Sequence, residues 1–187
     1  MSWRRWPFDL RWFMGLFLSL LWAVLALTAC SSSTSPLDTL TQAEPDHTRQ
    51  RAMRRLNLAS AYYEQGQTEV AQQEVRAALL IDPNFADAYS LLGLIHMRDN
   101  QVVLAQKSFE QALQLASQPK ASPADFAAIE HNYGWFLCQQ NLFPEAQTQF
   151  DHALTRTGYR QVDKTVAAIA FCKDRAAIHT DAGKRNN

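Results

Sequence analysis

The sequence predicts an all-α fold, a superhelix of repeated antiparallel helix pairs that follows an N-terminal targeting segment. The main observation is an internal period, which indicates a stack of similar structural units. A triplet of small, large and small residues recurs first after 34 residues and then after 41 residues. The three copies are Ala71, Val75 and Ala78, then Ala105, Phe109 and Ala112, and finally Ala146, Phe150 and Ala153.

Two further observations place a pair of helices in each unit. Upstream of each triplet, a small residue lies among large ones, and a small residue there lets two helix backbones approach closely. Between the two helices lies a residue that tolerates the left-handed conformation found at helix ends. The small residues are Ala59, Gly93 and Gly134, and the turn residues are Gly66, Asn100 and Asn141. This combination is the tetratricopeptide repeat (TPR) pattern.

The period predicts three complete repeats, at about residues 52–85, 86–119 and 127–160, in a domain that spans 51–180. Pro83 closes the first repeat, because proline cannot continue a helix. Pro144 falls in the first turn of a predicted helix, where its missing N–H costs nothing. The extra residues near 117–123 lengthen the loop between the second and third repeats.

A further helix is predicted at 163–180, where it matches the first helix of a fourth repeat. We expect it to cap the exposed edge of the third repeat, because each unit of such a stack buries its apolar face only against neighbours. A fourth repeat that has lost its second half is the alternative interpretation of the same residues. Residues 181–187 are predicted to form a tail.

The first 29 residues are predicted to be a lipoprotein signal peptide. A basic start and an uncharged segment at 12–29 are typical of secretory signals. The segment ends Leu27-Thr28-Ala29-Cys30, which resembles the bacterial lipobox, whose cysteine receives diacylglycerol. Because Ser31 follows, rather than an inner-membrane retention signal, we predict lipidation of Cys30 and anchoring to the outer membrane, facing the periplasm. An uncleaved membrane anchor is the alternative, since an 18-residue uncharged segment approaches the length of a spanning helix.

Residues 30–50 are predicted to be the lipidated cysteine and a flexible tether. Ser, Thr, Pro and Asp dominate this segment, and its apolar residues show no period. An arginine cluster follows at Arg49, Arg51, Arg54 and Arg55. It is either a solvated face of the first helix or a contact with anionic lipid head groups or an acidic partner.

The overall composition argues against two classes of function. The 18 basic and 18 acidic residues balance, whereas nucleic-acid binders normally carry a basic excess. The sequence lacks a nucleophile elbow, a zinc-protease motif and a glycine-rich phosphate loop. None of the five histidines has a partner at a spacing typical of metal sites, and His96 occupies a packing position in its repeat. The sequence therefore predicts no enzyme activity, catalytic residue, metal or cofactor.

Two cysteines, Cys138 and Cys172, lie in the third repeat and in the predicted terminal helix. First helices of successive repeats are spatial neighbours, so an oxidising periplasm favours a disulfide between them. Two buried free thiols are the alternative.

The first helices of such repeats line a concave surface, and the register predicts which residues face it. We expect this groove to bind a protein segment through exposed aromatic, Met and polar side chains, although some of these residues alternatively pack between repeats. The predicted groove residues are Tyr63, Asp87, Ser90, Leu94, Met97, Arg98, His131, Trp135 and Gln139, with Met53, Leu56, Ser60, Glu64 and Ala128 beside them and Cys138 at the rim.

A more specific resemblance appears in the third repeat. The stretch Asn132-Tyr133-Gly134-Trp135-Phe136-Leu137-Cys138, followed by Gly158-Tyr159-Arg160 and Asp163-Lys164-Thr165, is similar to the type IV pilus biogenesis/stability lipoproteins, the PilF/PilW pilotin family. The lipobox, the tether and the interrupted repeats also match. This resemblance implies an outer-membrane lipoprotein that helps the pilus secretin to reach the membrane and to form its multimeric ring. The alternative function is a general periplasmic adaptor that docks other envelope enzymes, for example those acting on peptidoglycan.

Overall fold

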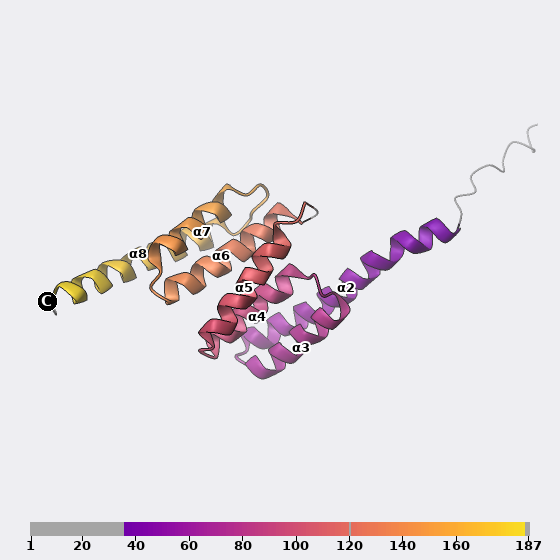
Figure 1. Ribbon diagram of the computed structural model, residues 1–187, viewed down its shortest axis with the longest axis horizontal. Coiled ribbons are helices and arrows are strands. Elements are labelled where there is room, and N and C mark those ends of the chain that lie inside the picture. Colours follow the sequence, from indigo (N-terminus) through magenta and orange to yellow (C-terminus); the bar gives the residue numbers. More distant parts are fainter. Residues whose placement is uncertain (1–35, 120, 186–187) are drawn as a thin grey trace, which may run out of the picture. The chain divides into compact units, whose positions relative to one another are not determined.

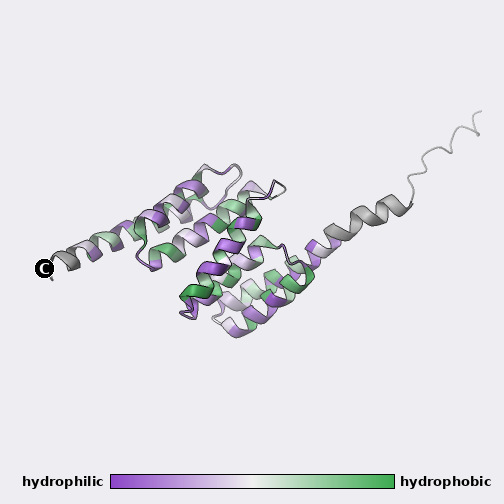
Figure 2. Ribbon diagram, viewed as in Figure 1, coloured by the Kyte–Doolittle hydropathy of each residue, from purple (hydrophilic) through white to green (hydrophobic). Residues whose placement is uncertain are grey.

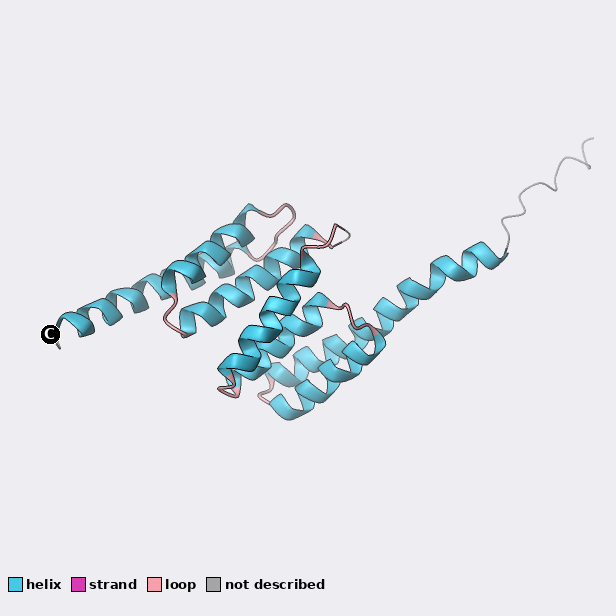
Figure 3. Cartoon of the chain, in the orientation of Figure 1, coloured by secondary structure: helices cyan, strands magenta, loops and turns pink. Residues whose placement is uncertain are grey.

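The computed structural model describes residues 36–119 and 121–185, with side chains described at 47–119 and 121–180. The predicted signal peptide and Cys30 therefore lie outside the described residues. The chain divides into two compact units, Met1–Glu44 and Pro45–Asn187, and the repeats belong to the second. In the described part every element is a helix, which confirms the predicted all-α class (Figure 3).

Within the described residues, three helix pairs and a terminal helix follow one another (Figure 1). The pairs are α2 (Pro36–Glu64) with α3 (Thr68–Ile81), α4 (Ala86–Arg98) with α5 (Val102–Ala116), and α6 (Pro123–Gln139) with α7 (Phe143–Thr155). The terminal helix is α8 (Val162–Arg185). Among α3 to α8, contacts join helices of the same repeat or of adjacent repeats, as in a solenoid.

The predicted turn residues have the expected backbone. Asn100 and Asn141 have φ of 57° and 64°, and Gly66 has φ of 78°. These positive values lie in the left-handed region, where glycine and asparagine are least strained. Each of these residues therefore ends the first helix of its repeat and lets the second helix return along it.

Small residues bring the two helices of a repeat together, as predicted. A Cβ atom at Gly93 would lie 2.8 Å from the ring of Phe109, and one at Gly134 would lie 2.8 Å from the ring of Phe150. Both phenylalanines are fully buried. The aromatic side chain of the second helix therefore occupies the space that a larger residue on the first helix would need.

The core is a series of clusters along the stack. The first joins α2, α3 and α4 through Ala52, Val75 and Ile95, among others. The second joins α5, α6, α7 and α8 and contains three buried phenylalanines, Phe109, Phe136 and Phe150. Hydrophilic and hydrophobic residues alternate along the helices, because each has one buried and one exposed face (Figure 2).

Three predicted boundaries were wrong. Helix α2 begins at Pro36, so residues 36–50, predicted to be flexible tether, are helical. Helix α6 begins at Pro123 rather than near 127, because Ser122 has the extended backbone of an N-cap and Pro123 suits the first helical turn. Helix α8 extends over 162–185, so it includes most of the predicted tail.

Candidate protein-binding groove

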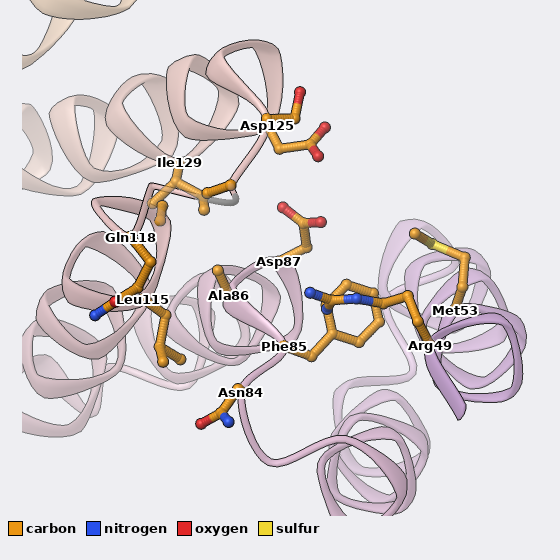
Figure 4. Close-up of a pocket in the computed structure, with 13 residues that line it drawn as sticks. Arg49, Met53, Asn84, Phe85, Ala86, Asp87, Leu115, Gln118, Asp125 and Ile129 are labelled. Carbon is orange, nitrogen blue, oxygen red and sulfur yellow. The ribbon is translucent and has the colours of Figure 1, made fainter. Parts of the chain in front are cut away.

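Two adjoining cavities lie along the first helices of the repeats. The first encloses about 670 Å³ between α2, α4 and α6, and Met53, Phe85 and Ile129 are among its walls (Figure 4). The second encloses about 380 Å³, and Asn132 of α6 and Lys164 of α8 are among its walls. Asp87 and Ile129 line both cavities, so the two form one groove, to which we refer below as the concave groove.

Part of the predicted groove lies where the register placed it. The second cavity is lined by Leu56, Ser60, Tyr63, Glu64, Asp87, Ser90, Leu94 and Ala128, and Met53 lines the first. Within the second cavity, Asn132 Nδ2 donates a hydrogen bond to Ser90 Oγ at 3.1 Å. Ser90 is buried, so the first helices of the second and third repeats pack against each other at this point.

The predicted residues of the third repeat behave differently, because α8 packs against them. His131 is buried, and its Nδ1 lies 2.8 Å from Thr165 Oγ1. The Trp135 ring lies 5.3 Å from the ring of Phe171. Gln139 Oε1 accepts a hydrogen bond from Arg175 at 3.3 Å. None of these three predicted groove residues lines either cavity.

Two predicted residues of α4, Met97 and Arg98, also lie outside both cavities. Met97 packs against the second core cluster. The Arg98 guanidinium lies 3.7 Å from the centroid of the Tyr63 ring and donates a hydrogen bond to the Tyr63 carbonyl. Arg98 therefore fixes the Tyr63 side chain at the end of the concave groove.

The sequence reasoning missed several residues of the first cavity, notably Arg49, Phe85, Asp125 and Ile129. Asp125 was missed because the third repeat was expected to begin at 127. The dipeptide Ser122-Pro123 was the signal for an earlier helix start, since serine caps and proline begins many helices.

Burial and neighbouring charges shift the pKa values of two ionisable groups in or near the concave groove. Burial raises the pKa of Asp87 to about 6, and the negative charge of Asp125 adds to this shift, while Arg49 opposes it. Burial also lowers the pKa of His131 to about 4, with a smaller contribution from the positive charge of Lys164. At neutral pH His131 is therefore uncharged and serves as a hydrogen-bonding core residue beside Thr165.

Three other predicted features have clear positions. His96 is buried, and its Nδ1 lies 2.7 Å from Gln101 Oε1, so it is a satisfied core histidine. Cys138 and Cys172 are joined as a disulfide between α6 and α8, with Cα atoms 5.9 Å apart. Arg55 pairs with Glu74 at 2.9 Å, and Arg49 pairs with Asp82 at 3.2 Å, so half of the arginine cluster forms ion pairs.

The described residues contain no group of three or more His, Cys, Asp or Glu side chains that could hold a metal ion. Within the same residues, none of the helices combines the length and the apolar character that crossing a membrane requires.

Comparison with known families supports the repeat assignment. A family described as "TPR repeat" matches residues 59–100, and one described as "Tetratricopeptide repeat" matches residues 86–119. The N-terminal domain of stress-induced protein-1 from C. elegans has a similar fold, with a TM-score of 0.51 at 19% identity over 66% of this chain and 97% of that one. The stacked helix pairs and the groove along their first helices define a tetratricopeptide repeat protein.

Sequence similarity to individual proteins is more specific than these repeat matches. The chain is 33% identical over 104 residues to "Type IV pilus assembly protein PilF" of Pseudomonas aeruginosa, which covers 56% of this chain and 38% of that protein. It is 29% identical over 121 residues to an uncharacterized protein of Haemophilus influenzae, covering 65% of this chain and 64% of that one.

Solved structures of Pseudomonas aeruginosa PilF and of PilW, described as a widely conserved type IV pilus biogenesis factor, each match with a TM-score of 0.59. Their identities are 27% and 29%, and the matches cover 70% and 68% of this chain. The chain spans 54% and 56% of the lengths of those two structures. This chain is therefore a tetratricopeptide repeat protein that is similar to PilF and PilW over about half of their lengths.

Proposed function

We propose that this protein is a non-enzymatic assembly factor for type IV pili, anchored by lipid at Cys30 to the outer membrane. In this proposal the concave groove binds a segment of the pilus secretin and assists its localisation and multimerisation. The main support is the similarity to PilF, which extends through the repeats to 70% of the chain.

The groove suits a protein segment better than a small metabolite. It is elongated, because two cavities share Asp87 and Ile129, so one extended segment can contact both cavities at once. Tyr63 offers an aromatic anchor that is held by Arg98, and such pre-ordered aromatic side chains often dominate the energy of protein interfaces. The lipid would confine this groove to the surface where a secretin assembles.

The test measures secretin multimers that resist heat and SDS in outer membranes, with and without the gene. We expect the multimers to disappear on deletion and to return with the wild-type gene but not with Cys30→Ser. Labelling with palmitate gives an independent reading, because Cys30→Ser should lose the label. Unchanged multimers after deletion would refute the pilus role and favour an adaptor for other envelope proteins.

A further inference from the structure

The first cavity is lined by two carboxylates that come from different helices. Asp87 and Asp125 come from the first turns of α4 and α6, and both line this cavity. Figure 4 shows the two side chains approaching the same opening from the two helices. Among the described residues, neither carboxylate forms an ion pair. Like charges placed this way repel one another unless a cation lies between them.

The nearby arginine does not supply that cation. Arg49 lines the same cavity, but its guanidinium pairs with Asp82 at 3.2 Å and lies 4.4 Å from the centroid of the Phe85 ring. The charge of Arg49 still acts on Asp87, but the two groups form no ion pair. Burial and then the charge of Asp125 raise the pKa of Asp87 to about 6 despite the opposing effect of Arg49, so the repulsion between the two carboxylates is only partly offset.

The walls of the cavity decide which kind of cation fits. Met53, which is 38% exposed, and the half-buried Leu115 give the cavity apolar walls that a bound group can contact. A metal ion of the calcium or magnesium type requires about six oxygen ligands, which two carboxylates among apolar walls cannot provide. A lysine or arginine side chain combines an apolar stem with a cationic head, which matches apolar walls below charged carboxylates.

We infer that the first cavity is a subsite for a basic side chain, arginine or lysine, of the protein segment bound in the concave groove. This inference rests on the proposed function as a protein-binding scaffold and adds the chemistry of its partner. The head of the bound side chain lies between Asp87 and Asp125, and its stem packs against the apolar walls of the cavity, next to Ile129. Because Asp87 and Ile129 also line the second cavity, the same segment continues along the groove toward Asn132.

The test is a titration of the full-length protein in detergent micelles, with isoleucine methyl groups labelled for NMR. The probes are N-acetyl-Ala-Arg-Ala-amide and the same peptide with citrulline, which keeps the shape of arginine and removes its charge. The Ile129 methyl reports on the cavity, and Ile178, 67% exposed on α8, is the reference. We expect saturable shifts at Ile129 with a Kd on the order of 1 mM for arginine, as suits a short peptide, and about tenfold weaker binding of citrulline.

Matched variants separate a specific contact from general charge. Asp87→Asn and Asp125→Asn should each weaken binding of the arginine peptide about tenfold, without changing that of the citrulline peptide. Asp163→Asn is the control, because Asp163 occupies the first turn of α8, is exposed and lines neither cavity. Thermal melting of each variant verifies that it is folded.

Equal binding of the two peptides, shifts confined to other methyl groups, absence of saturable shifts, or an equal effect of Asp163→Asn would each overturn the inference. These failures are distinguishable from failure of the proposed function. Loss of secretin multimers on deletion, combined with equal peptide binding, would refute only the basic subsite. Selective arginine binding combined with unchanged multimers would instead refute only the pilus role.

Discussion

Replacement of Gly93 by alanine should destabilise the protein, although alanine is the better helix former. An added Cβ would lie 2.8, 2.8 and 2.9 Å from three atoms of the Phe109 ring, closer than carbon atoms normally approach. The ring has little freedom to move, because Phe109 is fully buried and lies 5.7 Å from the ring of Tyr133 and 5.4 Å from that of Phe136. The clash must therefore be relieved by separation of α4 and α5.

Two opposing effects determine how much Gly93→Ala changes the free energy of unfolding. Overpacking of a core typically costs about 1–3 kcal/mol. Replacing glycine with alanine inside a helix returns about 0.5–1 kcal/mol. We therefore expect a net loss of about 1–2 kcal/mol in the free energy of unfolding, or a fall in Tm of roughly 2–8 °C for a domain of this size.

The assay is urea denaturation of four proteins: wild type, Gly93→Ala, Phe109→Val and the double variant. The first repeat provides the precedent, since Ala59 and Val75 occupy the corresponding positions and belong to one buried cluster. If the ring causes the loss, Gly93→Ala should be neutral or stabilising when valine replaces Phe109. An unchanged or higher stability of the single variant, or the same loss in both backgrounds, would refute this reasoning.

Three other predictions test the terminal part of the stack. Removing Arg156 as Arg156→Ala should cost about 3 kcal/mol in urea denaturation, because the buried Glu130, which is 2% exposed, loses the guanidinium bonded to it at 2.6 and 3.0 Å and keeps only His152, at 3.9 Å, as an ion-pair neighbour. Glu130→Gln combined with Arg156→Ala should lose less. The pKa of His131 falls from 6.5 to about 4 on folding, so its contribution to stability is full above pH 6.5 and is lost as the pH falls toward 4. His131→Asn should therefore flatten the pH dependence of the unfolding free energy in this range. An unchanged slope would contradict this reasoning. Cys172→Ser should lower stability by about 2–4 kcal/mol, and a reductant should lower the Tm of wild type but not of this variant; equal sensitivity of both to reductant would count against a disulfide to Cys138.

Local chemistry made the repeat architecture predictable. Asn100 and Asn141 could be recognised because few residues tolerate a positive φ, and Gly93 and Gly134 because helices approach closely only at small residues. These constraints act within one helix pair. Because the same constraints recur in each helix pair, they appear in the sequence as an internal period.

The composition of the groove depended on contacts between repeats and was less predictable. His131 and Trp135 have the periodicity of groove residues, but α8 packs against both, so their side chains serve the core and the helix interface. The buried pair of Glu130 and Arg156 was missed for the same reason, because the two residues meet only after α7 has folded back along α6. The helical residues 36–50 were missed because their composition is typical of linkers.

The disulfide between α6 and α8 has a consequence for how the stack opens. Among α3 to α8, every contact lies within one repeat or between adjacent repeats, so a solenoid of this kind can unravel progressively from one end. At the C-terminal end the covalent link holds α8 against α6. Local opening there gains less conformational entropy, because the disulfide keeps the opened chain in a closed loop. Unravelling should therefore start at the N-terminal side, so amide protons of α3 should exchange with solvent before those of α6.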